Sequence, residues 1–203
     1  MSFSIYQLKP QFQQLLQPLM RALVRCRVTP NQITLATMLL SVAYGAALAL
    51  QPQRPGLWAG LAGFLLLRMA LNAIDGMLAN ATGQKTRLGT LLNEICDQVS
   101  DVALYLPFML VLHAPLVVLA VAAALLAEFA GVLALSVGTA RRFDGPMGKS
   151  DRAFWFGLLG LLIAGDAAPL LLHGILALVI ALSAWTVVNR LRQALRASAP
   201  ATP

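Results

Sequence analysis

Long apolar segments are the feature of this sequence that most constrains its fold. A helix needs about 18 to 20 apolar residues to cross a bilayer, and stretches of about this length begin at Ile33, Leu57, Val102, Pro115 and Leu170. A shorter stretch, residues 153–165, is re-entrant unless its helix already starts in the polar residues 149–152. With 59% hydrophobic and only 11% charged residues, the chain is too apolar for an ordinary soluble domain. The sequence therefore predicts an all-α, polytopic membrane protein with about six transmembrane helices.

The basic residues are distributed unevenly along the chain. The sequence has 15 Lys and Arg against 8 Asp and Glu, a formal net charge of +7. Thirteen of the 15 lie before the first span, in the even-numbered connections or after the last span, whereas Arg54 lies on the opposite side and Arg68 within a span. Because Lys and Arg concentrate in cytoplasmic connections, we expect a bacterial inner-membrane protein with both termini and its active site in the cytoplasm. The charges border spans instead of forming one soluble face, which favours anionic membrane lipids and no nucleic acid as partners.

An amphipathic segment precedes the first span. Apolar residues recur at three- and four-residue steps between Ile5 and Val24, with Gln, Lys and Arg between them. We expect an interfacial helix that lies along the inner leaflet, with a soluble arm as the alternative. Pro10 and Pro18 are expected to split or kink this helix, and Asn31 is available to cap the helix that follows.

The chain has no convincing internal repeat and no linker long enough to separate domains. Residues 1–203 are therefore expected to form a single membrane domain. Within it, residues 1–30 would form the interfacial helix and turn, residues 31–195 the transmembrane helices, and residues 196–203 a cytoplasmic tail.

Two of the predicted helices carry polar stripes near the same membrane boundary. A helix advances about 100 degrees per residue, so the first stripe consists of Arg68, Asn72, Asp75, Gly76 and Ala79. The second stripe has a step of four residues and consists of Gly89, Asn93, Asp97 and Asp101, with Glu94 just beside it. An ionisable group at membrane depth costs about 2.5 kcal/mol or more unless it is paired, hydrated or bound to a metal. Carboxylates clustered in this way therefore call for a cation.

Oxygen donors of this kind favour Mg²⁺ or Mn²⁺ over zinc. Cys26 and Cys96 have no zinc-like spacing, and near the cytoplasmic side they are expected to stay unpaired. A metal beside basic residues favours a phosphate-bearing substrate and phosphoryl-type transfer at the membrane surface. Arg68 would either repel a metal or contact phosphate. Glu128, well inside the fourth span, is expected to face another helix or a polar cavity.

Residues 72–97 resemble the signature of the CDP-alcohol phosphatidyltransferase family, which in one-letter code is DxxDGxxAR, eight residues, GxxxDxxxD. This sequence reads NAIDGMLAN, eight residues, GTLLNEICD, and it matches every spacing of the signature. The family residue types are kept at Asp75, Gly76, Ala79, Gly89 and Asp97. Asparagine replaces the first and third acids, at Asn72 and Asn93, and the motif arginine, at Asn80.

The resemblance implies a reaction in which the hydroxyl of a polar alcohol attacks the lipid-side phosphorus of CDP-diacylglycerol, releases CMP and forms a new phospholipid. Carried over by position, it implies Asp97 as the catalytic base. It implies ligands for two Mg²⁺ or Mn²⁺ ions at Asn72, Asp75, Asn93 and Asp97. Asp101 and Glu94, on the same predicted helix as the second half of the signature, are candidate replacements for the two missing acids. The resemblance also implies nucleotide contacts from Asp75, Gly76, Ala79 and Asn80, and a homodimer, as in the family.

A second basic group lies on the same predicted face, between the fourth and fifth spans, and consists of Arg141, Arg142, Lys149 and Arg152. These side chains either bind a phosphorylated alcohol or merely follow the positive-inside rule. Glycerol 3-phosphate is the acceptor that we expect first, with serine, inositol or another polyol as alternatives. The residues GKS in this stretch do not form a P-loop, because Phe143 stands where that motif needs glycine.

The asparagines leave two other functions open. Asn72 and Asn93 lack the negative charges of the family acids, so metal binding would be weaker. One alternative is therefore a catalytically degenerate protein that binds lipid or nucleotide. Acids within a membrane also mark ion paths, which is the basis for an ion-coupled transporter as the other alternative. Asp75 and Asp97 are predicted near helix ends and beside a basic loop, and this position favours the transferase.

Overall fold

The computed structural model describes residues 9–198, which form seven α-helices and two short 3-10 helices. No strand occurs in this part of the chain, so the all-α prediction is confirmed. The α-helices are α1 (Lys9–Arg25), α2 (Pro30–Leu50), α3 (Pro55–Thr82), α4 (Arg87–Tyr105), α5 (Ala114–Leu133), α6 (Lys149–Ala164) and α7 (Pro169–Ser198), and the 3-10 helices are η2 (Leu106–Leu110) and η3 (Ala134–Val137).

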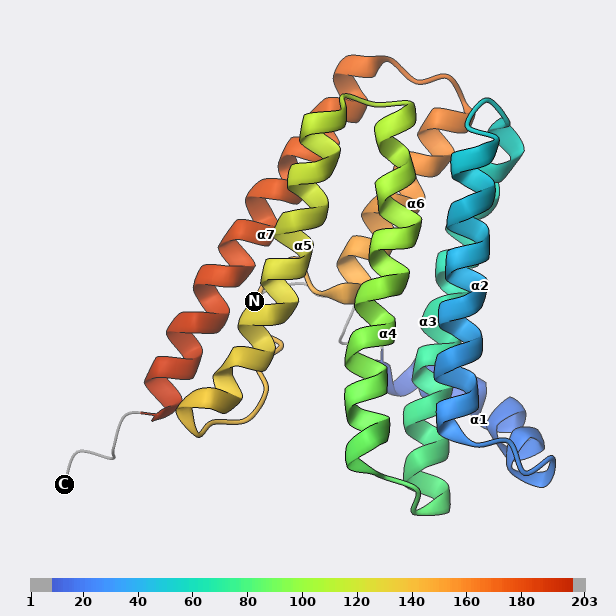
Figure 1. Cartoon of the computed structure of the whole chain (residues 1–203), viewed down its shortest axis with the longest axis vertical. Coiled ribbons are helices and arrows are strands. Elements are labelled where there is room, and N and C mark those ends of the chain that lie inside the picture. The colour runs from blue at the N-terminus through green and yellow to red at the C-terminus, as the bar shows by residue number, and fades with distance from the viewer. Residues whose placement is uncertain (1–8, 199–203) are drawn as a thin grey trace.

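The helices from α2 to α7 run alternately up and down, so that the α3–α4 and α5–α6 connections both begin at the lower end of the bundle (Figure 1). We call this end, which carries residues 83–86 and 138–148, the basic end. Helix α3 packs on α2 and α6, α2 packs on α4, and α5 packs on α7. The α5–α7 pair slopes away from the other helices toward the basic end (Figure 1). The α5–α6 connection climbs back to the middle of the bundle, where α6 begins.

Four helices among the described residues are long and apolar enough to cross a membrane: α2, α3, α5 continued by η3, and α7. Helix α4 carries the acids of the second stripe, and α6 has only 16 residues although it does start at Lys149. The count of six spans therefore stays a prediction for these two helices. Large apolar side chains such as Leu39, Leu66 and Leu126 are exposed on the outer faces of the bundle, where a bilayer would cover them.

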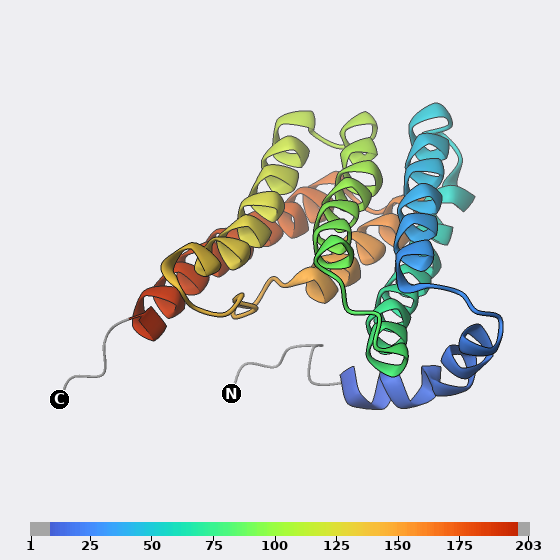
Figure 2. The same ribbon diagram turned by 60° about the horizontal axis from the view of Figure 1, so that its bottom comes forward.

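Helix α1 lies across the basic end of the bundle (Figure 2). Leu16 and Leu23 on one side of α1 pack against a buried cluster that α2 and α3 form, whereas Leu15 and Leu19 are exposed. Pro18 lies inside α1, which continues to Arg25, so the expected split does not occur, whereas a kink at Pro18 stays a prediction. An exposed apolar face is what an interfacial helix presents to lipid, and the location of α1 in the inner leaflet stays a prediction. Ile5, at the start of the amphipathic pattern, lies outside the described residues.

Thr29, and not Asn31, caps the start of α2. The Thr29 hydroxyl accepts from the backbone N–H of Gln32 over 3.3 Å, and the Gln32 side chain accepts from the Thr29 N–H over 2.9 Å. This capping box satisfies two N–H groups at the helix start. Pro30, at the first helical position, has no N–H group that would need a partner. The cap lies one residue before the proline, which is why the expected role of Asn31 is wrong. The side chain of Asn31 instead lines a pocket.

Close packing of α4 on α2 fixes the helix that carries the second stripe. A Cβ atom on Gly45 would lie 2.0 Å from the backbone oxygen of Ala103, so only glycine allows this approach. At the far end of α4, the Tyr105 ring stacks on Phe156 of α6 with 3.8 Å between ring centroids. These contacts hold α4 against α2 and α6 and fix the rotation of α4 about its own axis.

Candidate functional site

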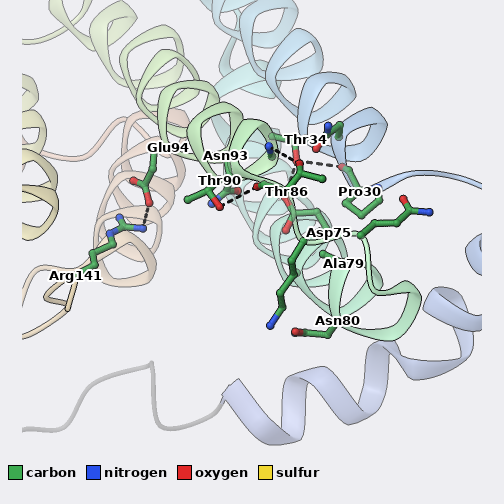
Figure 3. A pocket seen from close by; sticks show the side chains of 15 residues that line it. Pro30, Thr34, Asp75, Ala79, Asn80, Thr86, Thr90, Asn93, Glu94 and Arg141 are labelled. Atoms are coloured by element: carbon green, nitrogen blue, oxygen red, sulfur yellow. Dashed lines mark hydrogen bonds and ion pairs between the residues drawn. The ribbon is translucent and has the colours of Figure 1, made fainter. Parts of the chain in front are cut away.

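A cavity of about 390 Å³ opens at the basic end. Its walls are the start of α2, the last turns of α3, the α3–α4 connection and the first turns of α4, with one side chain from the α5–α6 connection (Figure 3). The lining residues are Pro30, Asn31, Thr34, Asp75, Gly76, Ala79, Asn80, Gln84, Lys85, Thr86, Gly89, Thr90, Asn93, Glu94 and Arg141.

The four residues expected at the nucleotide all line this cavity. Asp75, Gly76, Ala79 and Asn80 come from successive turns near the end of α3, which ends at Thr82 with Gly83 in the left-handed conformation. A side chain on Gly76 would meet nothing within 4 Å, so there is open space beside the backbone at this point. The structure thus brings these four residues together at one cavity, and their contacts with a nucleotide stay a prediction.

Asp75 is buried at the cavity wall and bonds to α2. Its Oδ2 accepts from the Thr34 hydroxyl over 3.0 Å, and that hydroxyl lies 3.1 Å from the Pro30 carbonyl oxygen. Within the described residues Asp75 forms no ion pair, so its charge is not balanced by a basic side chain in direct contact. Thr34 does not belong to the signature, and its position one turn after the helix start at Pro30 is the sequence signal that points to it.

The carboxylate of Asp97 already has partners on both oxygens. Its Oδ1 accepts from the Asn72 amide nitrogen over 3.0 Å and lies 3.7 Å from the Arg68 guanidinium. Its Oδ2 forms an ion pair with the Lys149 ammonium. Asn72 thus turns its amide nitrogen toward Asp97, and neither residue is among those that line the cavity.

Asp101 is buried one helical turn after Asp97 and is held by two arginines. Arg68 Nη1 forms an ion pair with one carboxylate oxygen, and Arg152 Nη2 lies 3.1 Å from the other. Arg68 Nη2 also donates to the backbone carbonyl of Asp97 over 3.0 Å. In this structure Arg68 contacts carboxylates, and its expected roles of repelling a metal or contacting phosphate stay predictions. With both oxygens in ion pairs, Asp101 is a poor candidate for a metal ligand.

Glu128 joins the α5–α7 pair to the rest of the bundle. Its Oε1 lies 3.0 Å from Arg152, and its Oε2 lies 3.0 Å from Arg141 and 3.4 Å from Arg190. Arg190 is buried as well and donates to the Ala127 carbonyl over 2.6 Å. The expectation that Glu128 faces another helix is confirmed. In the sequence Arg190 is one of the basic residues after the last predicted span, and nothing in the local pattern indicates that it is buried.

The four basic residues expected at a phosphorylated acceptor have different environments. Arg141 lines the cavity and also pairs with Glu94. Lys149 lies beside Asp97 with 31% of its side chain exposed. Arg142 pairs with Asp144 over 2.9 Å, away from the cavity lining. The Arg152 side chain is fully buried, so a substrate cannot reach it.

The donor chemistry fits one hard divalent ion better than two. Among the residues that the structure describes, no group of three or more His, Cys, Asp and Glu is arranged to bind a metal. Asp75 and Asn93 both line the cavity and offer the oxygen donors that Mg²⁺ and Mn²⁺ prefer, whereas Asp97 and Asp101 are paired with basic side chains. Cys96 is buried and unpaired, as expected, and is not needed as a ligand.

Two curated relatives match nearly the whole chain. Inner membrane protein YnbA of Escherichia coli (strain K12) is 46% identical over 199 residues, which are 97% of this chain and 98% of that protein. Phosphatidylinositol phosphate synthase of Corynebacterium glutamicum is 32% identical over 186 residues, which are 88% of this chain and 83% of that protein.

Two solved structures of phosphatidylinositol phosphate synthase (PgsA1) from Mycobacterium tuberculosis share the fold. The structure with CDP-DAG bound gives a TM-score of 0.75 at 21% identity and covers 94% of this chain and 99% of that one. The complex with manganese and citrate gives a TM-score of 0.74 at 22% identity, with 92% of each chain covered. The model of the family described as CDP-alcohol phosphatidyltransferase matches residues 27–190. From the cavity at the basic end, the signature along its wall and these matches, the chain belongs to the CDP-alcohol phosphatidyltransferase family of enzymes.

Proposed function

We propose that this membrane protein transfers the phosphatidyl group of CDP-diacylglycerol to the hydroxyl of a phosphorylated polyol and releases CMP. The observation that carries the proposal is the shared wall of one cavity: Asp75, Gly76 and Asn80 line it from α3, and Arg141 reaches it from the α5–α6 connection. A negatively charged group and a positively charged group thus line the same cavity, as a metal-bound donor and a phosphorylated acceptor would require. The CDP-DAG in one structure of the same fold supports the choice of donor.

The nucleotide half of the donor is proposed to lie against the end of α3. Gly76 and Ala79 have almost no side chain, so a flat ring can approach the helix backbone. Asn80 stands where the family has arginine, and Lys85, which also lines the cavity, would supply a positive charge near the phosphates. The two acyl chains would leave the site along the apolar outer faces of the bundle.

The acceptor is proposed to carry its own phosphate. Arg141 and Lys149 are partly exposed, with 24% and 31% of their side chains accessible, and both bear a charge that a phosphate would bind. Relatives named phosphatidylinositol phosphate synthase support a phosphorylated polyol. Glycerol 3-phosphate is a smaller molecule of the same chemical class, so an acceptor panel has to include both.

Asp97 is proposed as the base that accepts the proton of the attacking hydroxyl. The hydroxyl oxygen forms a bond to the lipid-side phosphorus, the bond from that phosphorus to the CMP oxygen breaks, and the proton passes to the Asp97 carboxylate. The Lys149 ammonium has three N–H donors, so it can hold Asp97 and the acceptor phosphate together. This contact would orient the hydroxyl for attack without removing Lys149 from Asp97.

A divalent metal, Mg²⁺ or Mn²⁺, belongs to the proposed reaction, as the manganese in a structure of the same fold supports. When bound, it would neutralise the diphosphate and polarise the lipid-side phosphorus. Asp75 and Asn93 are the residues that we propose to hold it, because both line the cavity with oxygen donors. Asn72 and Asp97 are less suited as metal ligands, because the Asn72 amide donates a hydrogen bond to the Asp97 carboxylate.

The protein is proposed to work in a bacterial inner membrane as a homodimer, with both termini and the cavity on the cytoplasmic side. The name of the relative YnbA, an inner membrane protein, supports the location. The basic residues of the connections at the cavity end support the orientation, because such residues stay on the cytoplasmic side.

The decisive experiment is CMP release by the purified chain. The protein in lipid nanodiscs would be given CDP-diacylglycerol, Mn²⁺ or Mg²⁺, and separately glycerol 3-phosphate, inositol phosphate, inositol, serine and glycerol. We expect CMP and a new phospholipid with at least one phosphorylated alcohol and much less with the unphosphorylated ones. No CMP with any alcohol, beside an active family member as control, would refute the enzymatic proposal.

A binding protein without turnover is the second candidate, and the Lys149–Asp97 ion pair is the observation that favours it. The Lys149 ammonium occupies one oxygen of the carboxylate that turnover would need as a base. Saturable binding of CDP-diacylglycerol without CMP release from any alcohol would support this candidate. The transporter alternative is less well supported, because Asp75 lies only seven residues before the end of α3 at Thr82.

A further inference from the structure

We propose that the Lys149 ammonium takes the place of a metal ion at Asp97 and is thus the resident cation of this carboxylate. This chain would then bind a single divalent ion, at Asp75, and not the two ions that the signature implies. The inference rests on the metal in the proposed function and concerns which residues of this chain leave room for it. Its basis is the difference between the environments of the two carboxylates.

Both carboxylate oxygens of Asp97 already have polar or basic partners. Oδ2 is taken by the Lys149 ammonium, and Oδ1 accepts from the Asn72 amide and lies 3.7 Å from Arg68. A divalent ion at Asp97 would have to displace Lys149 or lie beside two positive side chains. Like charges at contact distance are unfavourable, and more so in a partly buried site with 14% of the Asp97 side chain exposed.

Neighbouring charges do not leave a negative surplus for a second ion. Arg68 is shared between Asp97 and Asp101, and Asp101 has Arg152 as a further partner. Each acid on this side of α4 is therefore matched by basic groups of the protein itself. A divalent ion would be needed to balance these acids only if the basic groups were absent. Here the basic groups are present and come from two other helices, α3 and α6.

Asn72 is matched to this arrangement. Its amide nitrogen donates to Asp97 over 3.0 Å, a bond that an ionised carboxylate at position 72 could not make. A carboxylate there would add a second negative charge beside Asp97, which a lysine alone would not balance. Asn72 and Lys149 thus together bind the Asp97 carboxylate, where the family signature has an acid at position 72 and implies a metal ion.

Asp75 differs from Asp97 in each of these respects. Its partner is the neutral Thr34 hydroxyl, it lies on the cavity wall with Asn93, and it forms no ion pair with any described residue. One carboxylate with nearby amide and hydroxyl oxygens suits a hard divalent ion that keeps several of its waters. This leaves room for one ion.

Counting bound Mn²⁺ tests the inference without reference to turnover. The full chain in nanodiscs would be titrated with Mn²⁺, and free Mn²⁺ would be followed by its sharp six-line EPR signal. We expect one Mn²⁺ per wild-type chain, none in Asp75→Asn, and one in Asp97→Asn, because Asp97 is not a ligand of that ion. Lys149→Met is expected to bind a second ion, since Asp97 loses its cation.

Two control variants make the result specific. Lys149→Arg keeps the charge and should bind one ion. Arg142→Met removes a charge from the α5–α6 connection, just before the helix that carries Lys149, and should also bind one ion, because Arg142 pairs with Asp144 and not with Asp97. Two ions in the wild type, loss of the ion in Asp97→Asn, or unchanged stoichiometry in a folded Lys149→Met would each overturn the inference. An equal gain in Arg142→Met and Lys149→Met would overturn it too.

The outcomes separate this inference from the proposed function. One Mn²⁺ per chain with no CMP from any alcohol would refute the transferase and leave the resident lysine standing. Turnover with two Mn²⁺ per wild-type chain would do the reverse. If Lys149→Met does not fold, the Asp97→Asn stoichiometry still decides, because its retained ion cannot depend on Asp97.

Discussion

Arg152 of α6 and Glu128 of α5 form an ion pair in the interior of the bundle, with 3.0 Å between Nη2 and Oε1. Both side chains are almost completely buried. Arg152 also holds Asp101 of α4, so one guanidinium connects three helices. The residue that the sequence offers as a phosphate ligand is therefore a structural element behind the site.

Removing this guanidinium should destabilise the protein strongly. Arg152→Met leaves two buried carboxylates with one partner fewer, and breaking a buried pair costs about 3 to 5 kcal/mol. The midpoint of thermal unfolding in detergent would measure the loss. Arg142→Met removes a partly exposed pair with Asp144 and should shift the midpoint little. Equal midpoints for both variants would contradict the structural role.

Asp97→Asn should abolish turnover while the fold stays intact. A general base contributes about 100- to 10,000-fold to a rate, and asparagine has the same shape but does not accept the proton. CMP release measures the loss, and circular dichroism with the thermal midpoint checks the fold. Unchanged turnover would remove Asp97 from the role of base.

Thr34→Val should weaken the function of Asp75 through loss of one hydroxyl. A hydrogen bond to a charged group is worth about 1.5 to 3 kcal/mol, so we expect a decrease of about 10- to 100-fold in kcat/KM for CDP-diacylglycerol. Thr37 offers a matched control, because it is buried on the same helix and its hydroxyl has no hydrogen-bond partner in the described structure. If Thr37→Val lowered kcat/KM as much as Thr34→Val, the bond to Asp75 would not be the cause.

Arg141→Gln should raise KM for a phosphorylated acceptor about 10-fold or more, because it removes a charge-assisted contact with phosphate. KM for CDP-diacylglycerol should change little. Arg142→Gln, from the neighbouring position that does not line the cavity, should leave both KM values nearly unchanged. Steady-state CMP release with varied acceptor distinguishes these outcomes, and a larger effect at Arg142 would relocate the acceptor.

The sequence was sufficient to predict the helical fold and the polar stripe on α3, part of which lines the cavity. Hydropathy marked the long helices, and a strict spacing on one helix fixes which side chains share a face, so Asp75 to Asn80 were predicted to lie together. The family resemblance added the chemistry, because the spacing alone does not distinguish a metal site from a helix contact.

The partners of the acids could not be predicted, because they depend on how separate helices rotate against one another. Lys149 and Asp97 are 52 positions apart, and Arg190 and Glu128 lie on different helices of the α5–α7 pair. No local period relates them. Asn72 was expected to be a metal ligand by position, and the structure instead gives its amide nitrogen a carboxylate to bind.

The distribution of the buried charges over five helices has a consequence for biogenesis. Asp101 and Glu128 are synthesised before Arg152 and Arg190, which supply one of the two ion pairs that Asp101 forms with described residues and two of the three that Glu128 forms. Early helices must therefore keep these groups hydrated or provisionally paired until the last two helices arrive. Of these ion pairs, chains that stop before α6 would keep only the Arg68 contact of Asp101 and the Arg141 contact of Glu128, so both acids would be incompletely paired in the bilayer. Completion of the charge pairs thus coincides with completion of the chain.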